Sequence, residues 1–367
     1  MSKETLFYPR MKSLTDQWMD LFGYAAPAVV TDTLEEYRAV REKAGIMDFG
    51  MLRKYDIDGP NAVEGVNRVV GRDVAALKPG QIAYGPLCNE QGKMVDDCTV
   101  LVRRPDRARF CGANDKDRAH LQHGVGAKVT VRDVTDETGH LCLQGPMSRE
   151  WLQGLADRDL SREAFPYYTF NDEVVLAGIP VFMTRLGYTA ELGYEIWVDA
   201  ERALELWDRL FEALEPKGMK LIGMTALDLF RIEGGFIIGG VEYNETVSPY
   251  ECGLGWAVNF DKGEFQGRAG LERDRQASPV RLTSVVLDSG GDAATDSPLR
   301  VKGADVGTVT QAVSSPFLGG KTLGLAKIRK DLAVAGTAVT AQVGGEKVAG
   351  EVVRHPVYEP ERKKVKS

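Results

Sequence analysis

The sequence predicts an α+β protein of two or three packed domains that ends in a small all-β domain. Three observations support this class. The chain has 367 residues, which is more than one ordinary hydrophobic core holds. Short alternating runs typical of strands are interspersed with a few stretches of helical periodicity. The last ~85 residues contain only β-type runs separated by glycines, which favours a barrel or sandwich.

The first helix is expected from Thr33 to about Ala44. Thr33 and Glu36 have the spacing of a capping box, in which each side chain accepts a hydrogen bond from a free backbone N–H. The chain then changes to strand-like texture up to about residue 126. Strands are expected at Lys54 to Asp58, Cys98 to Val102, Lys128 to Val134 and Leu141 to Gln144.

Two further helices are expected in the second half. One covers Ala200 to about Glu215, with an apolar face and a stop at Pro216 and Gly218. The other runs from Ile222 to Glu233, and in it Asp228 and Arg231 are three residues apart and able to pair on the helix surface.

A domain boundary is expected in the polar stretch from 272 to 279. The first region then covers residues 1–275, and the C-terminal β-barrel domain covers residues 280–359. The basic tail, residues 360–367, is most simply a solvated end.

Composition excludes several classes of function. A net charge of -7 argues against a nucleic-acid surface. The five cysteines lack the paired spacings of zinc sites or disulfide frameworks, and the four histidines offer too little for a metal centre. No apolar run approaches the ~18 residues that cross a bilayer. We therefore expect a cytoplasmic protein with no metal, no nucleic acid and no membrane partner.

Three stretches carry residues suited to chemistry. The first, Gly187 to Glu195, is a glycine-punctuated turn with two tyrosines and two carboxylates. The second, Cys88 to Asp97, ends in adjacent aspartates, one of which can point into a cleft while the other faces solvent or caps the turn. The third, Gly240 to Trp256, is either a long packed loop or a cleft wall with stacking surfaces for a flat polar ligand.

Tyr188-Thr189-Ala190-Glu191-Leu192-Gly193-Tyr194-Glu195 resembles the signature of the folate-dependent aminomethyltransferase superfamily, which includes the glycine cleavage T-protein. The resemblance extends over nearly the whole chain. Further matching motifs lie at Arg41 to Asp48, Asn89 to Asp97, Leu143 to Pro146, Ala226 to Glu233, Gly253 to Trp256, Asp261 to Arg268 and Ser314 to Gly319.

The resemblance implies a three-domain cloverleaf around a central tetrahydrofolate site, with one of two interleaved subdomains of the first region at about 48–138. Asp97 matches the acid near N5 and N10 of the folate, and is the expected catalytic residue. Glu195 matches the acid that binds the pterin. The other expected cofactor-binding residues are Tyr188, Tyr84, Tyr168, Met51 and Trp256.

Departures from the family pattern indicate which branch of the superfamily the chain resembles. The T-protein arginine is replaced by Leu227, as in folate domains of the dimethylglycine dehydrogenase group, an asparagine by Cys111, and a signature glycine by Ala190. The sequence Asp261-Lys262-Gly263-Glu264 lacks the Lys-Gly-Cys-Tyr motif of the iron–sulfur repair branch.

The leading functional hypothesis is a tetrahydrofolate-dependent methyltransferase or demethylase. It would move a one-carbon group, methyl or methylene, from a small methylated substrate to tetrahydrofolate. A divergent T-protein that takes an aminomethyl group from a lipoyl carrier protein is the first alternative, and a folate-binding protein without turnover is the second. The methyl donor, whether a sulfonium, a methylated amine or an aryl methyl ether, stays open.

Overall fold

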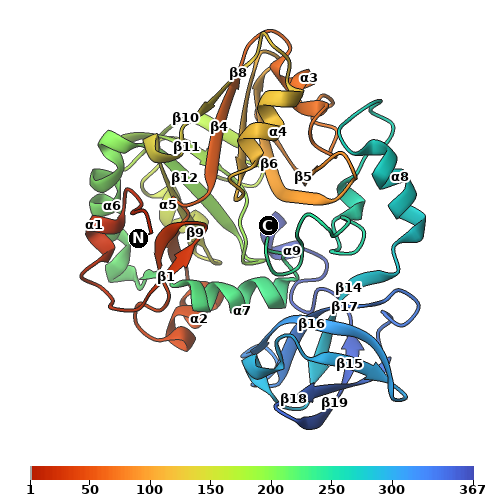
Figure 1. The fold of residues 1–367 in the computed structure, drawn as a ribbon. Coiled ribbons are helices and arrows are strands. Elements are labelled where there is room, and N and C mark those ends of the chain that lie inside the picture. Colours follow the sequence, from red (N-terminus) through yellow and green to blue (C-terminus); the bar gives the residue numbers. More distant parts are fainter. Residues whose placement is uncertain (1) are drawn as a thin grey trace.

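The computed structural model describes residues 2–367; Met1, the first residue of the predicted first region, lies outside the described residues. The chain forms a larger body and a smaller C-terminal barrel, coloured blue in Figure 1. Two mixed groups of strands and helices make up the body, and both contribute to one cavity.

The first sheet of the body has the order β10-β11-β12-β9-β3-β13. Its neighbouring strands are antiparallel except β13, which runs parallel to β3. The strands are β10 (Phe170–Leu176), β11 (Ile179–Thr184), β12 (Gly193–Asp199), β9 (Thr138–Gln144), β3 (Gly45–Asp48) and β13 (Lys220–Leu221). Five helices of the described residues are interspersed along the chain with the strands of this sheet. They are α1 (Tyr8–Met11), α2 (Thr33–Glu42), α5 (Ser148–Gln153), α6 (Ala200–Leu214) and α7 (Met224–Gly234).

The second sheet has the order β5-β6-β7-β4-β8 and is antiparallel. Its strands are β5 (Gln81–Cys88), β6 (Met94–Arg104), β7 (Arg107–Gly112), β4 (Arg53–Asp58) and β8 (Thr130–Asp133), with α3 (Ala62–Asn67) and α4 (Asp117–Gly124) beside them. A separate hairpin joins β1 (Trp18–Leu21) to β2 (Tyr24–Pro27).

The C-terminal barrel is closed in the order β14-β17-β16-β15-β18-β19. Its strands are β14 (Val280–Leu287), β15 (Pro298–Val301), β16 (Ala304–Ser314), β17 (Thr322–Arg329), β18 (Ala338–Val343) and β19 (Glu346–Val353). The helix α8 (Arg268–Ala277) precedes it, so most of the polar stretch expected to hold the domain boundary is helical. Short 3-10 turns occur at Thr135–Glu137, Glu215–Lys217, Gly255–Ala257 and Gly291–Ala294.

The start of α2 differs from the predicted capping box. Asp32 is the N-cap, and its carboxylate accepts from the N–H groups of Leu34 and Glu35, both at 3.0 Å. Glu36 is fully buried and accepts instead from Val30, Thr31 and Gly223. The capping-box prediction is wrong because Glu36 serves a distant backbone N–H that local spacing cannot reveal.

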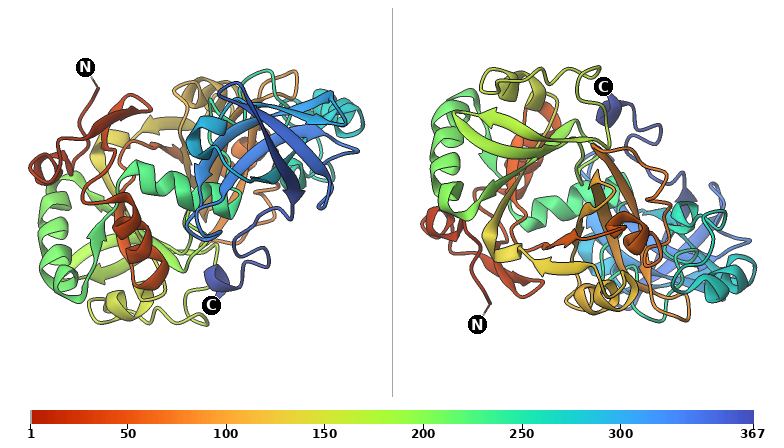
Figure 2. Two further views of the ribbon diagram at one scale, coloured as in Figure 1. Left: turned by 90° about the horizontal axis from the view of Figure 1, so that it is seen from below. Right: turned by 90° about the horizontal axis from the view of Figure 1, so that it is seen from above.

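Two charged features expected at the surface are buried or packed. Arg231 pairs with Asp228 at 2.7 Å as predicted, but its side chain is only 1% exposed and also reaches Glu242. The C-terminal tail is not a free solvated end. It leaves the barrel and runs back along one edge of the body, where α9 (Lys363–Lys366) lies and Val365 is buried (Figures 1 and 2).

Candidate functional site

One cavity brings together most of the predicted site residues. Its walls come from both body sheets, from α7 and from the turn between β1 and β2, and the cavity with its open mouth encloses about 1060 Å³. Asp97, Glu195, Tyr84, Tyr168, Tyr188 and Met51 all line it. Much of the remaining surface is apolar, from side chains such as Phe22, Leu227 and Phe236.

Asp97 projects from β6 into this cavity, as strand alternation allows, while Asp96 faces the other side. The Tyr84 hydroxyl donates to Asp97 Oδ2 at 2.8 Å, and the Tyr243 hydroxyl lies against Asp97 Oδ1. Asp97 is thus held by two phenols. Burial, and next the charge of Asp96, raise the pKa of the Asp97 carboxyl to about 7.

Asp96 does not face solvent, which the sequence left open for one of the two aspartates. It is 1% exposed, and its Oδ2 accepts from the backbone N–H groups of Ala113 and Asn114, at 2.5 and 3.0 Å. The Tyr243 hydroxyl lies 2.8 Å from its Oδ1. Asp96 therefore supports the strand that presents Asp97 and fastens the turn after β7.

Glu195 stands at the start of β12, next to His140 on the paired strand β9. Thr184 donates to Glu195 Oε2 at 3.0 Å, and His140 Nε2 lies 3.3 Å from the same oxygen. Burial lowers the pKa of His140, so the imidazole is neutral at pH 7. Among the described residues nothing donates to Glu195 Oε1, which leaves a carboxylate oxygen available to a ligand.

Tyr188 lies in the loop that precedes β12. The close packing of this loop against Gln144 explains why it contains glycines. A Cβ atom on Gly187 or Gly193 would lie within 2.4 Å of the Gln144 side-chain amide, so a side chain at either position would force Gln144 to move. Gln144 donates to the Leu186 carbonyl and accepts from the Thr189 hydroxyl. The Tyr188 hydroxyl donates to the Ile237 carbonyl, which directs its ring along the cavity wall.

Trp256 does not line the cavity, so its prediction as a binding residue is not matched by its position. It is 63% exposed, and its ring centroid lies 6.3 Å from that of Tyr84. Tyr243 is buried and acts through its hydroxyl on Asp97 rather than as a stacking surface. The loop from 240 to 256 is thus mostly the packed loop that the sequence offered as the plain alternative.

Two residues near the site, His140 and Lys54, were missed by sequence reasoning as members of it, whereas Cys111 was already noted as a departure from the family pattern. His140 lines the cavity beside Glu195, and Cys111 lines it beside the strand that carries Asp97. Lys54 is fully buried and donates to the carbonyls of Leu52 and Gly50; burial lowers its pKa to about 8. Only the sheet pairing of distant strands brings His140 and Lys54 here, and no motif at their positions signals it.

Two kinds of feature are absent from the part of the chain that the structure describes. Across residues 2–367, no helix combines the length and apolar character needed to cross a bilayer. Within the same residues, no group of three or more His, Cys, Asp or Glu side chains could hold a metal ion.

The chain matches two family models in succession. The model described as the GCVT N-terminal domain matches residues 7–262, and the model described as the glycine cleavage T-protein C-terminal barrel domain matches residues 281–359. A solved structure described as glycine cleavage system aminomethyltransferase T from Bartonella henselae superimposes with a TM-score of 0.88. It is 24% identical, and the match covers 98% of this chain and 99% of that one. The predicted fold class is therefore confirmed.

Curated relatives carry two kinds of name. An aminomethyltransferase of Halothermothrix orenii is 32% identical over 96% of this chain and 99% of that protein, and one of Shouchella clausii is 34% identical over 93% of each. A trimethylamine-oxide aldolase of Ruegeria pomeroyi is 31% identical over 100% of this chain but only 48% of that protein. The chain therefore belongs to the glycine cleavage T-protein-like superfamily that its motifs resemble.

Proposed function

We propose that this protein is a tetrahydrofolate-dependent one-carbon transferase that moves a methyl group from a small methylated substrate to tetrahydrofolate. The observation that carries the proposal is that Asp97 and Glu195, far apart in sequence, line the same cavity with three tyrosines between apolar walls. Tetrahydrofolate would supply the amine nitrogen that accepts the one-carbon group.

The residues present fit a pterin. Its 2-amino group and N3–H are paired donors, and the open Oε1 of Glu195, with Oε2 beside it, offers acceptors for them. Leu227 and Ile237 give a flat ring an apolar surface, while the Tyr188, Tyr84 and Tyr168 rings line the channel. Leu227 provides no charged contact where T-proteins have an arginine.

The charge of the cavity favours a cationic or neutral methyl donor. The lining includes the carboxylates of Asp97 and Glu195, and among the described lining residues there is no lysine or arginine. Asp97, held by Tyr84 and Tyr243, would orient such a donor or hold a proton beside the reacting nitrogen. The aromatic faces nearest to it would add cation–π attraction.

A divergent T-protein activity is the second candidate, because full-length relatives at 32% and 34% identity are named aminomethyltransferase. A T-protein would accept its aminomethyl group from a lipoyl carrier protein. Turnover with an aminomethylated lipoyl protein at a rate above that with every small methylated donor would favour this reading over the first.

Isothermal titration with tetrahydrofolate under reducing conditions tests the proposal directly. We expect binding by the wild type, and a Kd about 10- to 100-fold higher for Glu195→Gln, because a charge-assisted hydrogen bond is replaced by a neutral one. Glu173→Gln is the matched control, since that side chain is 79% exposed on β10. Absence of binding by the wild type, or equal binding by Glu195→Gln, would contradict the proposal.

The donor class is found by a second experiment. Sulfonium, methylated amine and aryl methyl ether compounds are incubated with enzyme and tetrahydrofolate, and methyl-tetrahydrofolate is quantified. An Asp97→Asn variant should lose most of the activity while still binding tetrahydrofolate. If Asp97→Asn retained full activity on every donor, or no donor reacted with wild type, the non-catalytic folate-binding alternative would be favoured.

A further inference from the structure

The C-terminal strap, residues 358–367, crosses from the barrel to the loop that carries Tyr188 (Figure 1). Only two of its side chains, Tyr358 and Val365, are buried, so apolar burial does not by itself explain its placement. What holds it is a set of polar contacts to residues that flank the cavity.

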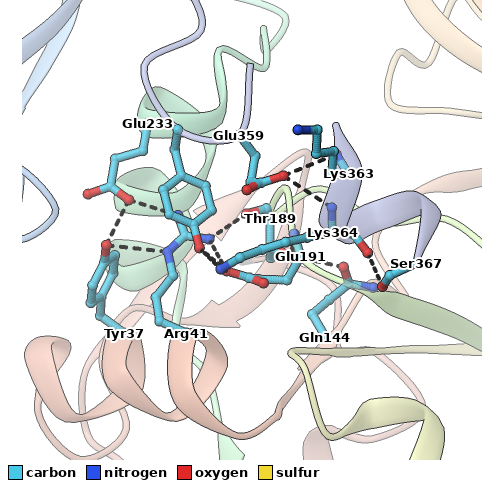
Figure 3. A network of polar contacts seen from close by, with 11 residues as sticks. Tyr37, Arg41, Gln144, Thr189, Glu191, Glu233, Glu359, Lys363, Lys364 and Ser367 are labelled. Atoms are coloured by element: carbon cyan, nitrogen blue, oxygen red, sulfur yellow. Dashed lines mark hydrogen bonds and ion pairs between the residues drawn. The ribbon is translucent and has the colours of Figure 1, made fainter. Parts of the chain in front are cut away.

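The first attachment is at Glu191, three residues after Tyr188 (Figure 3). Lys364 Nζ lies 3.3 Å from Glu191 Oε1 and also donates to the Tyr358 hydroxyl, which itself donates to the same carboxylate oxygen. From the other side, Arg41 donates to Glu191 Oε1 at 3.1 Å and to the Thr189 carbonyl at 2.8 Å. The strap and α2 therefore both bind the loop, from opposite sides of Glu191.

The second attachment is behind Tyr188. Arg362 of the strap donates to the Gly234 carbonyl at 2.7 Å, and its guanidinium lies 4.6 Å from the ring centroid of Phe236. Phe236 packs against Tyr188, with ring centroids 4.9 Å apart, and both rings line the cavity. The strap therefore supports the rear of a cavity wall.

The third attachment is at the other end of the loop. The buried Arg185 donates to the Val365 carbonyl at 2.9 Å. Leu186, the next residue, lines the cavity. Residues 185 and 191 bracket the loop, and the strap contacts both.

The contact between Lys364 and Glu191 affects the charge balance of a buried group. Glu191 and Glu233 are nearly inaccessible, with 1% and 0% of their side chains exposed, and Arg41 at 8% is shared between them. Lys364 is the second cation of this group, so that two positive charges face the two carboxylates. Without it, two buried carboxylates face one guanidinium, which disfavours the observed position of the loop.

We propose that the C-terminal strap is part of the framework of the tetrahydrofolate site, with Lys364 and Tyr358 acting through Glu191 as positioning residues for loop 185–192. This inference rests on the proposed function for the identity of the ligand. The strap contacts themselves do not depend on it.

The test compares full-length variants by tetrahydrofolate titration and by hydrogen exchange of residues 185–192. Lys364→Met keeps the apolar stem and removes the charge, and Tyr358→Phe removes one hydroxyl. We expect Lys364→Met to raise Kd about tenfold, in line with loss of one charge-assisted hydrogen bond, and to speed exchange in the loop. Lys364→Arg should restore both values.

Arg354→Met is the matched control, because Arg354 forms an ion pair with the strap residue Glu361 at 2.8 Å, but this pair is solvent-exposed and does not contact the loop. It should leave Kd and loop exchange unchanged. The double variant Glu191→Gln with Lys364→Met should bind better than the product of the two single effects predicts, since a neutral amide at position 191 no longer needs the lysine charge.

Unchanged Kd and unchanged loop exchange in both Lys364→Met and Tyr358→Phe would overturn the inference. A raised Kd with unchanged loop exchange would also overturn it, because the strap would then act other than by positioning the loop. Failure of the wild type to bind tetrahydrofolate would instead reject the proposed function, while the exchange measurement would still report whether the strap orders the loop.

Discussion

The Asp97 carboxyl combines two properties that rarely occur together at a strand residue. It is reachable from a cavity, yet it is surrounded by the Tyr84 and Tyr243 hydroxyls and by the second acid Asp96. Burial, and next the charge of Asp96, raise the pKa of this carboxyl, whereas the hydrogen bonds from the two phenols lower it. Its protonation state therefore changes close to neutral pH.

Titration of the Asp97 carboxyl should give an apparent pKa of about 7. Carbon-13 NMR of labelled aspartate measures it, and Asp97→Asn assigns the signal. Because the folded-state pKa lies above the unfolded value of about 3.9, the stabilising effect of this group is complete below that value. It is lost as pH rises to about 7. Wild type should therefore lose stability relative to Asp97→Asn over this range, and a parallel pH dependence of the two proteins would contradict the assignment.

Ala190 marks a second residue-scale feature. It is fully buried and has φ 61°, in the left-handed region that strains residues with a Cβ atom. The family signature has glycine there. We expect Ala190→Gly to raise stability by up to about 1 kcal/mol in urea unfolding, because release of strain exceeds the added freedom of the unfolded chain. Ala213→Gly, inside α6, should instead lower stability by about 1 kcal/mol.

At the scale of elements, α2 shows how a helix is placed by local and distant groups at once. Asp32 caps its first turn locally, while the Glu36 carboxylate reaches the N–H of Gly223, just before α7. The two helices are thereby set side by side. Arg41 and Tyr37 at the far end of α2 then meet Glu233 of α7.

The correction of the helix cap is testable. Asp32→Ala should cost about 1 kcal/mol of unfolding free energy, because two N–H groups lose their acceptor. Thr33→Ala should change it by less than about 0.5 kcal/mol, since no cap bond involves Thr33. Urea unfolding of both variants measures the difference. A larger loss of stability in Thr33→Ala than in Asp32→Ala would support the capping box instead.

For the whole molecule, Glu233 is one of the groups that join the body to the barrel. One oxygen accepts from Tyr37 and Arg41 of α2, and the other accepts from Ser315 and from the Phe317 N–H, next to the barrel strands. The Glu233 carbonyl also accepts from the Tyr358 N–H of the strap. The barrel and the strap thus reach the same helix.

Glu233→Ala should therefore be strongly destabilising, by about 3 to 5 kcal/mol, because it leaves the buried Arg41 with only Glu191 as a counter-charge. Ser315→Ala removes one hydrogen-bond donor to this carboxylate and should cost about 1 kcal/mol. Chemical unfolding followed by tryptophan fluorescence measures both. Equal effects of the two variants would show that the charge pairing contributes little.

Much of this fold could be predicted where the signal is local. The periodic face of α6 and the strands β4, β6 and β9 lie where alternation and turn residues placed them, within a few residues. The motif resemblance led to Asp97 and Glu195, and both line one cavity. Their roles stay predictions, as do the domain boundaries.

By itself, the sequence determined the superfamily, the α+β class with its C-terminal barrel, and six of the residues that line the cavity. Periodicity and ordered motifs are local properties that can be recognised in the sequence alone. Only the tertiary structure decided that Trp256 lies outside the cavity, that the Tyr243 hydroxyl lies against Asp97, and that the basic tail contacts the loop around Tyr188. Each of these depends on how segments far apart in the sequence pack together and pair their buried polar groups, which no local pattern encodes.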